Sequence, residues 1–247
     1  IVQRAESLMS LFYLLTLYAF IRGADGKRSA GWFLLSSACC LLGMATKEVM
    51  VSAPVVVLLY DRTFLAGTFG AAWRQRWRIH LTLAATWILL AGLVLQNTNR
   101  GGSAGFGLGV GFGKYFATQF QAVVHYLRLV LWPRPLIIDY GVQWTTSVWT
   151  MVPYVLAVGV LAVATVVALV RRPALGFLGF VFFALLAPSS LVPVIRQTLA
   201  EHRMYLALAP VLVSIVLAMH RALKRRIWLI AAVATLGFGG LTIQRNY

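Results

Sequence analysis

The amino-acid sequence predicts an all-α protein, a polytopic bundle of transmembrane helices. Hydrophobic residues make up 60% of the 247 residues and charged residues only 11%, whereas soluble domains are about 25% charged. The mean hydropathy is +0.82. Apolar runs of about 16 to 20 residues recur along the chain, near the length at which a helix crosses the hydrocarbon layer. Because these runs are too long and too uniformly apolar for barrel strands, and because lipid cannot satisfy backbone polar groups, we expect helices.

Taken in order, the apolar runs predict about eight membrane crossings. The shorter run 49–60 supplies one of them, but at 1.5 Å per residue it covers only about 18 Å. The turn before it, at 46–48, is therefore expected to lie below the membrane surface. The longer runs are 5–21, 30–46, 79–96, 150–170, 174–189, 204–219 and 227–243.

The basic residues indicate topology rather than a nucleic-acid partner. The formal net charge is +16, yet the basic residues lie between the apolar runs instead of gathering on a soluble face, so we expect no nucleic acid to bind. By the positive-inside rule, four groups of them mark cytoplasmic connections. Both ends of the sequence and the remaining connections then face outward, which requires an even number of crossings. The residues of the four groups are Arg22, Lys27, Arg28, Arg62, Arg74, Arg76, Arg78, Arg171, Arg172, Arg221, Lys224, Arg225 and Arg226.

One amphipathic helix, 113–131, is predicted within the outer loop region 97–149. Its polar residues are spaced by 4, 3, 4 and 3, which gives one polar stripe on an otherwise apolar helix. A spanning helix here would make the number of crossings odd and would move Arg171 and Arg172 to the outer side. We therefore expect an interfacial helix. The stripe consists of Lys114, Thr118, Gln121, His125 and Arg128.

The six acidic residues fall into two groups. Asp25 and Asp61 lie among the arginines of the cytoplasmic connections, where a solvated turn explains them. The other four lie at outer helix ends or in outer connections, each with a base close in sequence. A charge at membrane depth costs about 2.5–3.5 kcal/mol and normally pairs or lines a polar cavity, so we expect one charged site at this face; snorkelling residues in ordinary turns are the alternative. The pairs are Glu6 with Arg4, Glu48 with Lys47, Asp139 with Arg134, and Glu201 with Arg203.

The segment 187–210, APSSLVPVIRQTLAEHRMYLALAP, forms the second part of the expected site. It leaves one helix, follows the outer face and re-enters the membrane. Arg196 and Arg203 offer planar guanidinium donors, either to a phosphate or to lipid headgroups. The spacing predicts no metal site, because His202 has no second His or Cys at ligand distance along the chain. The residues at the membrane mouth are Glu201, His202, Arg203 and Tyr205.

Four motifs follow one another along the chain: IVQRAESLMSLFYLLTLYAFIR, ATKE, YLRLVLWPRPLIIDY and PSSLVPVIRQTLAEHRMYL. In this order they resemble the multi-pass membrane glycosyltransferases of the GT-C superfamily, and within it the TMTC-type protein O-mannosyltransferase group and its bacterial relatives that carry tetratricopeptide repeats. The resemblance implies that 1–247 is part of a GT-C-like transmembrane domain. It also implies transfer of a sugar, mannose or another hexose, from a polyprenyl-phosphate carrier to a protein or glycan hydroxyl on the periplasmic or lumenal side.

The resemblance further implies where the chemistry lies. The acidic catalytic base is expected in an outer loop before residue 1, and the repeats after residue 247, so we expect the chain alone to be inactive. A departing phosphate needs cations and the attacking hydroxyl needs a carboxylate. The expected substrate-binding residues are Arg203, Lys47, Arg4 and Arg196 on phosphate, with Asp139, Tyr140 and Tyr205. The expected helpers are Glu48 and Glu6, which orient these bases or hold a metal or the acceptor, and Glu201 and His202 on the acceptor side.

Other functions stay open at this point. A transporter or flippase for a lipid-linked or anionic substrate would place ionisable residues at mid-membrane in several helices, whereas 150–170, 174–189 and 227–243 contain no charge. An O-antigen ligase or polymerase shares the multi-pass plan, and a non-catalytic membrane anchor of a repeat protein is also compatible. We name no cofactor and leave a divalent metal open. Membrane lipids are expected partners, and a bacterial inner membrane is favoured over the endoplasmic reticulum.

Overall fold

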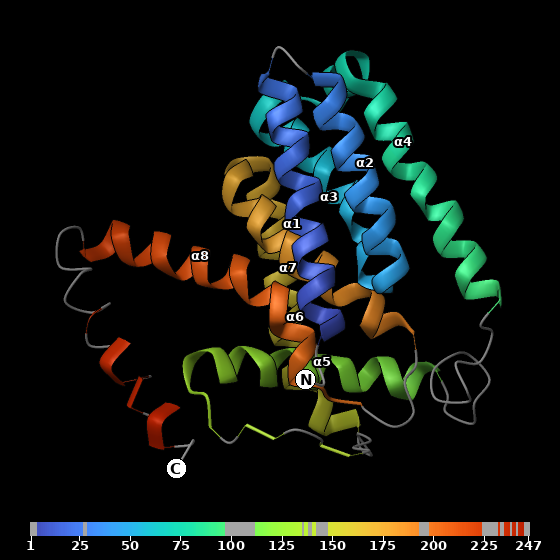
Figure 1. Ribbon diagram of the computed structural model, residues 1–247. Helices are drawn as coiled ribbons and strands as arrows, with labels where there is room; N and C mark the ends of the chain where they lie inside the picture. Colours follow the sequence, from blue (N-terminus) through green and yellow to red (C-terminus); the bar gives the residue numbers. More distant parts are fainter. Residues whose placement is uncertain are drawn as a thin grey trace.

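The computed structural model describes most of the predicted helices. Among the described residues all regular structure is helical, without a strand, and seven helices are long and apolar enough to cross a membrane. The predicted all-α polytopic bundle is therefore confirmed (Figure 1). The last predicted run, 227–243, falls largely outside the described part. The described residues are 4–26, 29–96, 112–134, 136–137, 140–141, 148–192, 198–223, 232, 235–237, 239–240 and 242–244.

Five helices match predicted runs closely, because each is apolar through its middle. Figure 1 shows α1 and α2 side by side, joined at their upper ends, whereas α8 turns away from the bundle. The helices are α1 (Arg4–Asp25), α2 (Ser29–Thr46), α6 (Val148–Arg171), α7 (Pro173–Leu191) and α8 (Met204–Leu223), and the 3-10 turn η4 (Glu201–Arg203) precedes α8.

The third span is longer than the run 49–60. The 3-10 turn η1 (Glu48–Ser52), helix α3 (Ala53–Tyr60) and the π-helical turn η2 (Asp61–Ala66) follow each other without a break. Together they comprise 19 residues, about 28 Å at 1.5 Å per residue, which is enough to cross the hydrocarbon layer. The prediction of a short third span is therefore wrong, and the depth of the turn at 46–48 relative to the membrane surface stays a prediction. Composition misplaces the boundary because an aspartate and an arginine begin η2 and have the polarity of a loop.

Asp61 is buried, and the prediction of a solvated turn residue is wrong. Its exposed fraction is 0%. Its carboxylate accepts hydrogen bonds from Arg76, at 2.6 Å from Nη2 and 3.0 Å from Nε, and lies 2.8 Å from His80 Nε2. Arg76 is also the point at which α4 (Phe69–Gln96) departs from helical geometry, with φ −136° and ψ 27°. These contacts join the π-helical turn of the third span to the kink of the fourth.

Helix α5 (Phe112–Leu131) crosses one end of the bundle instead of running along it (Figure 1). Its bounds agree with the predicted amphipathic helix to within one residue, and its crosswise course is the one expected of an interfacial helix. The predicted polar stripe is not a single solvent face, however. Thr118 is fully buried, whereas Lys114 and Arg128 are exposed. The buried face of α5 includes Tyr115 and Gln119 instead.

Close helix contacts in the bundle depend on small residues and on hydrogen bonds across helices, as is usual where lipid surrounds the protein. A Cβ atom at Gly176 of α7 would overlap the backbone of Leu169 in α6. The hydroxyl of Ser36 donates to the Thr16 carbonyl oxygen at 2.8 Å, which links α2 to α1. These contacts bring the helices to close approach without long side chains between them.

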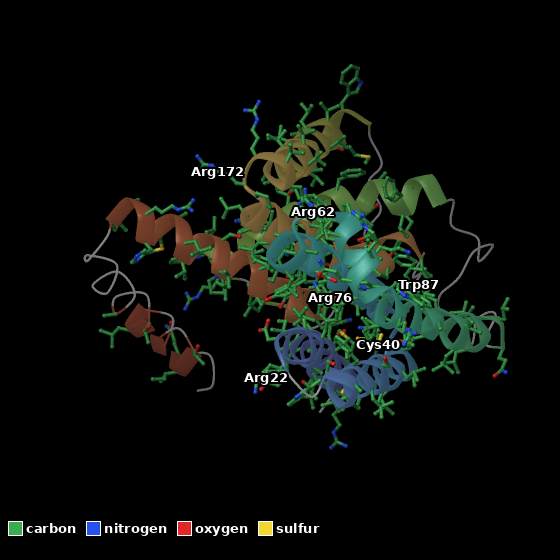
Figure 2. All side chains as sticks on the ribbon, turned by 90° about the horizontal axis from the view of Figure 1, so that it is seen from above. Arg22, Cys40, Arg62, Arg76, Trp87 and Arg172 are labelled. Atoms are coloured by element: carbon green, nitrogen blue, oxygen red, sulfur yellow. The ribbon has the colours of Figure 1, made fainter. Side chains whose placement is uncertain are left out.

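The two ends of the bundle differ in charge, as the distribution of basic residues predicts. The last turn of α1, the turn η2, the beginning of α4 and the connection from α6 to α7 bring arginines to the upper end in Figure 1. Figure 2 looks down from that side and labels four of them. The arginines of this end are Arg22, Arg62, Arg74, Arg76, Arg78, Arg171 and Arg172. The beginning of α1, the connection from α2 to η1, and η4 meet at the opposite end, beside α5.

Candidate functional site

The centre of the candidate site is an ion pair between two segments far apart in sequence. Glu6, in the first turn of α1, has an exposed fraction of only 4% and pairs with the ammonium group of Lys47. His202 Nε2, from η4, lies 3.7 Å from the same carboxylate oxygen. Three elements thus bring one anion, one cation and an imidazole to one point at the end of the bundle.

The local backbone explains how Lys47 reaches α1. Helix α2 ends at Thr46, whose hydroxyl donates to the carbonyl oxygens of Leu42 and Gly43 at 3.0 and 2.8 Å. Lys47 is then extended, with φ −161° and ψ 144°, and η1 begins at the next residue. One extended residue between two helical elements turns its side chain out of both. The pairing matters energetically, because an uncompensated carboxylate at this burial would be costly.

Arg203 is held by the buried face of α5. Its Nη1 donates to the amide oxygen of Gln119 at 3.1 Å and to the hydroxyl of Tyr115 at 3.4 Å. The amide nitrogen of Gln119 donates in turn to the Thr198 carbonyl oxygen at 3.3 Å, and the Tyr115 hydroxyl donates to Ser189 O at 2.7 Å. The guanidinium is therefore positioned by the crosswise helix as well as by its own turn.

Glu201, the first residue of η4, links the beginning of α8 to the segment that follows α5. Its Oε1 accepts a hydrogen bond from the Tyr140 hydroxyl at 2.6 Å and another from the Ile137 backbone N–H at 2.8 Å. The Tyr140 oxygen also lies 3.0 Å from His125 Nε2. Because the single hydroxyl proton of Tyr140 goes to Glu201, His125 must be the donor to Tyr140 and carries its proton on Nε2.

The pKa values of two side chains in this series of hydrogen bonds differ from their ordinary values. Burial lowers the pKa of His125, and Arg128 lowers it further, while Glu201 opposes both. Burial and the hydrogen bond to Glu201 raise the pKa of Tyr140. At neutral pH the histidine is therefore uncharged and the tyrosine keeps its proton, so Glu201 is the one formal charge among the three side chains.

Cavities adjoin these charged residues. One of about 240 Å³ is lined by Lys47 and Glu48 on one side and by apolar residues of α2 and α4 on the other. A second, of about 220 Å³, lies between α5 and α8 and reaches Glu201. A third, of about 210 Å³, lies between α5, α6 and α7. Gln119, which accepts the hydrogen bond from Arg203, is one of its lining residues. Charged groups and cavities thus share one end of the bundle, and the cavities beside Gln119 and Glu201 are the mainly apolar ones.

Most of the predicted site residues meet at this end, but with different partners. Proximity in the sequence predicts Arg4 as the partner of Glu6. In the structure Glu6 instead forms an ion pair with Lys47, which is 41 positions away. Arg4 is exposed at the first residue of α1. Tyr205 is 53% exposed, and its hydroxyl accepts a hydrogen bond from Ser7 at 3.4 Å. Predicted residues that lie outside the described part are Asp139 and Arg196. Predicted residues placed at this end of the bundle are Glu6, Lys47, Glu48, Tyr140, Glu201, His202, Arg203 and Tyr205.

Sequence reasoning missed the residues of α5 that hold the re-entering segment. Tyr115 and Gln119 contact Arg203, and the Tyr126 hydroxyl accepts a hydrogen bond from the Ala200 N–H at 2.8 Å. These residues are spaced by 4 and 7, which is a second helical face beside the predicted polar stripe. That spacing was the available signal, although tyrosines on an amphipathic helix also suit a simple interfacial role.

The described part of the chain offers no donor set for a metal centre. Across those residues no group of three or more His, Cys, Asp or Glu side chains is placed to hold a metal ion. No protein-family model, no curated protein and no solved structure matches the chain.

Proposed function

We propose that the protein is a membrane glycosyltransferase of the GT-C type. It moves a hexose, mannose being the first candidate, from a polyprenyl-phosphate carrier to a hydroxyl of a protein or glycan acceptor. The observation that carries the proposal is the convergence of Glu6, Lys47 and His202 with Glu201 and Arg203 at one end of the bundle, beside one partly polar cavity and one mainly apolar cavity. The resemblance of the four sequence motifs supports the same function.

The cations suit the leaving group of this reaction. As the sugar leaves its carrier, negative charge develops on the lipid phosphate, and preorganised cations stabilise that charge. Arg203 offers a planar fork of donors that is already oriented by Gln119, and Lys47 offers a compact charge oriented by Glu6. In this proposal Glu6 is a positioning residue, because its carboxylate is occupied by Lys47 and faces His202.

The acceptor side of the proposal involves Glu201. Its carboxylate is held by Tyr140 and Ile137 at the edge of the cavity between α5 and α8. A carboxylate there can accept hydrogen bonds from an acceptor hydroxyl. The catalytic base itself is assigned to none of these residues.

The apolar cavities suit the carrier. A polyprenyl chain approaches from the membrane, and the cavity between α5, α6 and α7 has an almost wholly apolar lining with Gln119 at its polar side. The phosphate of a carrier lying there would be delivered toward Arg203. We propose that this end faces the periplasm or lumen, because the arginine-rich end suits the cytoplasm by the positive-inside rule.

The test uses the full-length protein in vesicles with polyprenyl-phosphate-linked hexoses and a hydroxyl-bearing acceptor. The Arg203→Ala and Lys47→Ala variants are each expected to lose about 10²–10³-fold in transfer rate, the magnitude typical of a removed charge-stabilising donor. Arg128→Ala, an exposed cation on α5, is the matched control and is expected to leave transfer unchanged. Arg203→Lys, which keeps the charge but loses the fork, serves if the alanine variant does not fold.

Two results would count against the proposal. Unchanged transfer in well-folded Arg203→Ala and Lys47→Ala variants would remove both residues from the site. Movement of the intact lipid-linked sugar across the vesicle membrane, without transfer to the acceptor, would favour the flippase alternative. A size-exclusion profile for each variant separates loss of function from loss of fold.

A further inference from the structure

The opposite end of the bundle carries a second charged surface that the proposed function does not use. We call it the arginine surface; it comes from α1, η2, the beginning of α4, and the connection between α6 and α7. Figure 2 looks down on this end and labels Arg22, Arg62 and Arg172. The surface is defined as Arg22, Arg62, Arg74, Arg78, Arg171 and Arg172.

The arginine surface has a large excess of positive charge. Among the described residues of this end, the acids are Asp25 and Asp61. Asp61 is fully buried and its carboxylate is occupied by Arg76 and His80. Only Asp25, which is exposed, therefore remains to offset the six arginines of the surface. An external anion is needed to balance them.

Aromatic rings stack on three of these guanidinium groups. Arg22 lies 5.7 Å from the ring centre of Trp32, and Arg62 lies 5.6 Å from that of Phe69. Arg78 lies 5.6 Å from that of the neighbouring Trp77. Stacking on a ring occupies the face of a guanidinium and leaves its N–H edges for other partners. Arg62 is half-buried and its Nη1 donates to the Leu169 carbonyl oxygen at 3.1 Å, whereas Arg22 and Arg78 are exposed and can offer their edges to an anion. Aromatic rings at the end of a membrane helix mark the depth of the lipid headgroups.

The kink in α4 adds a geometric feature. Arg76 is held inward by Asp61 and is the non-helical residue of the kink. Arg74 and Arg78, on either side of it, are exposed, as are the bulky rings of Trp73 and Trp77. The first turns of α4 therefore present cations and apolar rings together, which is the composition of a segment that lies among headgroups.

We propose that the arginine surface binds anionic phospholipids of the adjacent leaflet, through contacts between their phosphate groups and the exposed guanidinium groups. The charge excess requires an anion, and the exposed rings beside the arginines require that the anion carry an acyl chain. A zwitterionic lipid offers no net charge, and free phosphate offers no apolar part. The inference is independent of the proposed transferase activity at the other end.

The test is competition between phosphatidylglycerol and phosphatidylcholine for the purified full chain, read by native mass spectrometry after release from the detergent micelle. The parent protein is expected to retain phosphatidylglycerol in clear preference. A basic residue near an anionic surface contributes about fivefold in affinity, so Arg74→Gln/Arg78→Gln is expected to lower retention by about 25-fold. The control, Arg128→Gln/Arg134→Gln, removes the same charge at the opposite end and is expected to keep the preference.

Several outcomes would overturn the proposal. One is equal retention of the two lipids by the parent protein. Another is an equal loss in both double variants, which would show a general charge effect and no local surface. Displacement of phosphatidylglycerol by inorganic phosphate at millimolar concentration would identify a phosphate site instead of a lipid surface. If Arg74→Gln/Arg78→Gln does not give a folded protein, Arg171→Gln/Arg172→Gln tests the same surface from another connection.

Discussion

Replacing Asp61 by asparagine is expected to destabilise the bundle although the two side chains have nearly the same volume. The carboxylate has an exposed fraction of 0% and meets three nitrogen atoms within 3.0 Å. Removing one partner of a buried ion pair costs about 3–5 kcal/mol, because the other charge is left uncompensated. Arg76 keeps 17% of its side chain exposed, so water relieves part of that cost and the lower end, about 3 kcal/mol, applies.

Thermal unfolding of the purified protein in detergent measures this effect. For a chain of this size about 1 kcal/mol corresponds to 2–4 °C in Tm, so Asp61→Asn is expected to lower the Tm by roughly 6–12 °C. Asp25→Asn is the matched control, because Asp25 is an exposed aspartate at the same end; such surface changes usually stay within about 0.5 kcal/mol. If Asp61→Asn unfolds at the temperature of the parent protein, the buried ion pair contributes no net stability and the reasoning fails.

Three further predictions concern stability. Lys47→Met is expected to lower the free energy of unfolding by about 3 kcal/mol, because it leaves Glu6 buried without a cation. The added change Glu6→Gln is expected to restore most of that stability. Thermal unfolding of both variants in one detergent measures the effect, and additive losses would contradict the pairing. The lowered pKa of His125 means that the unfolded chain binds its proton more readily, so stability is full above about pH 7 and falls as the pH drops through 6.5; His125→Gln should flatten this part of the stability curve, and an unchanged pH profile would exclude the residue as its source. Gly176→Ala is expected to cost about 1–3 kcal/mol, since its methyl group overlaps the backbone of α6; a Tm equal to that of the parent would show that α6 and α7 separate without cost.

The sequence was sufficient for the spans because hydropathy is a local property. A run of apolar residues needs no knowledge of its neighbours, and α1, α2, α6, α7 and α8 accordingly lie where the runs predict. Hydropathy fails where charges compensate one another across the fold. Asp61 is charged, and a charge in the sequence suggests a loop. It is buried within a span because Arg76 approaches it from another helix and compensates its charge.

The candidate site was likewise only partly predictable from the sequence. The residues that gather at one end could be predicted, because charges are scarce in this chain and successive helices run in opposite directions. Their partners were not, because neighbours in sequence are a poor guide when helices connect distant segments. Glu6 meets Lys47 through the packing of α1 against the connection after α2, and Arg203 meets Gln119 through the crosswise course of α5. Local spacing places Gln119 on a helical face, but it does not identify Arg203 as its partner, nor Lys47 as the partner of Glu6.

Gln119 restricts which side chains its position accepts. One arm of its amide accepts a hydrogen bond from Arg203, while the other donates to the Thr198 carbonyl oxygen. A glutamate of the same length can do the first but not the second, a lysine the second but not the first, and a methionine neither. When homologous sequences are aligned, glutamine is expected to persist at this column wherever arginine persists at column 203, and the two positions are expected to change together.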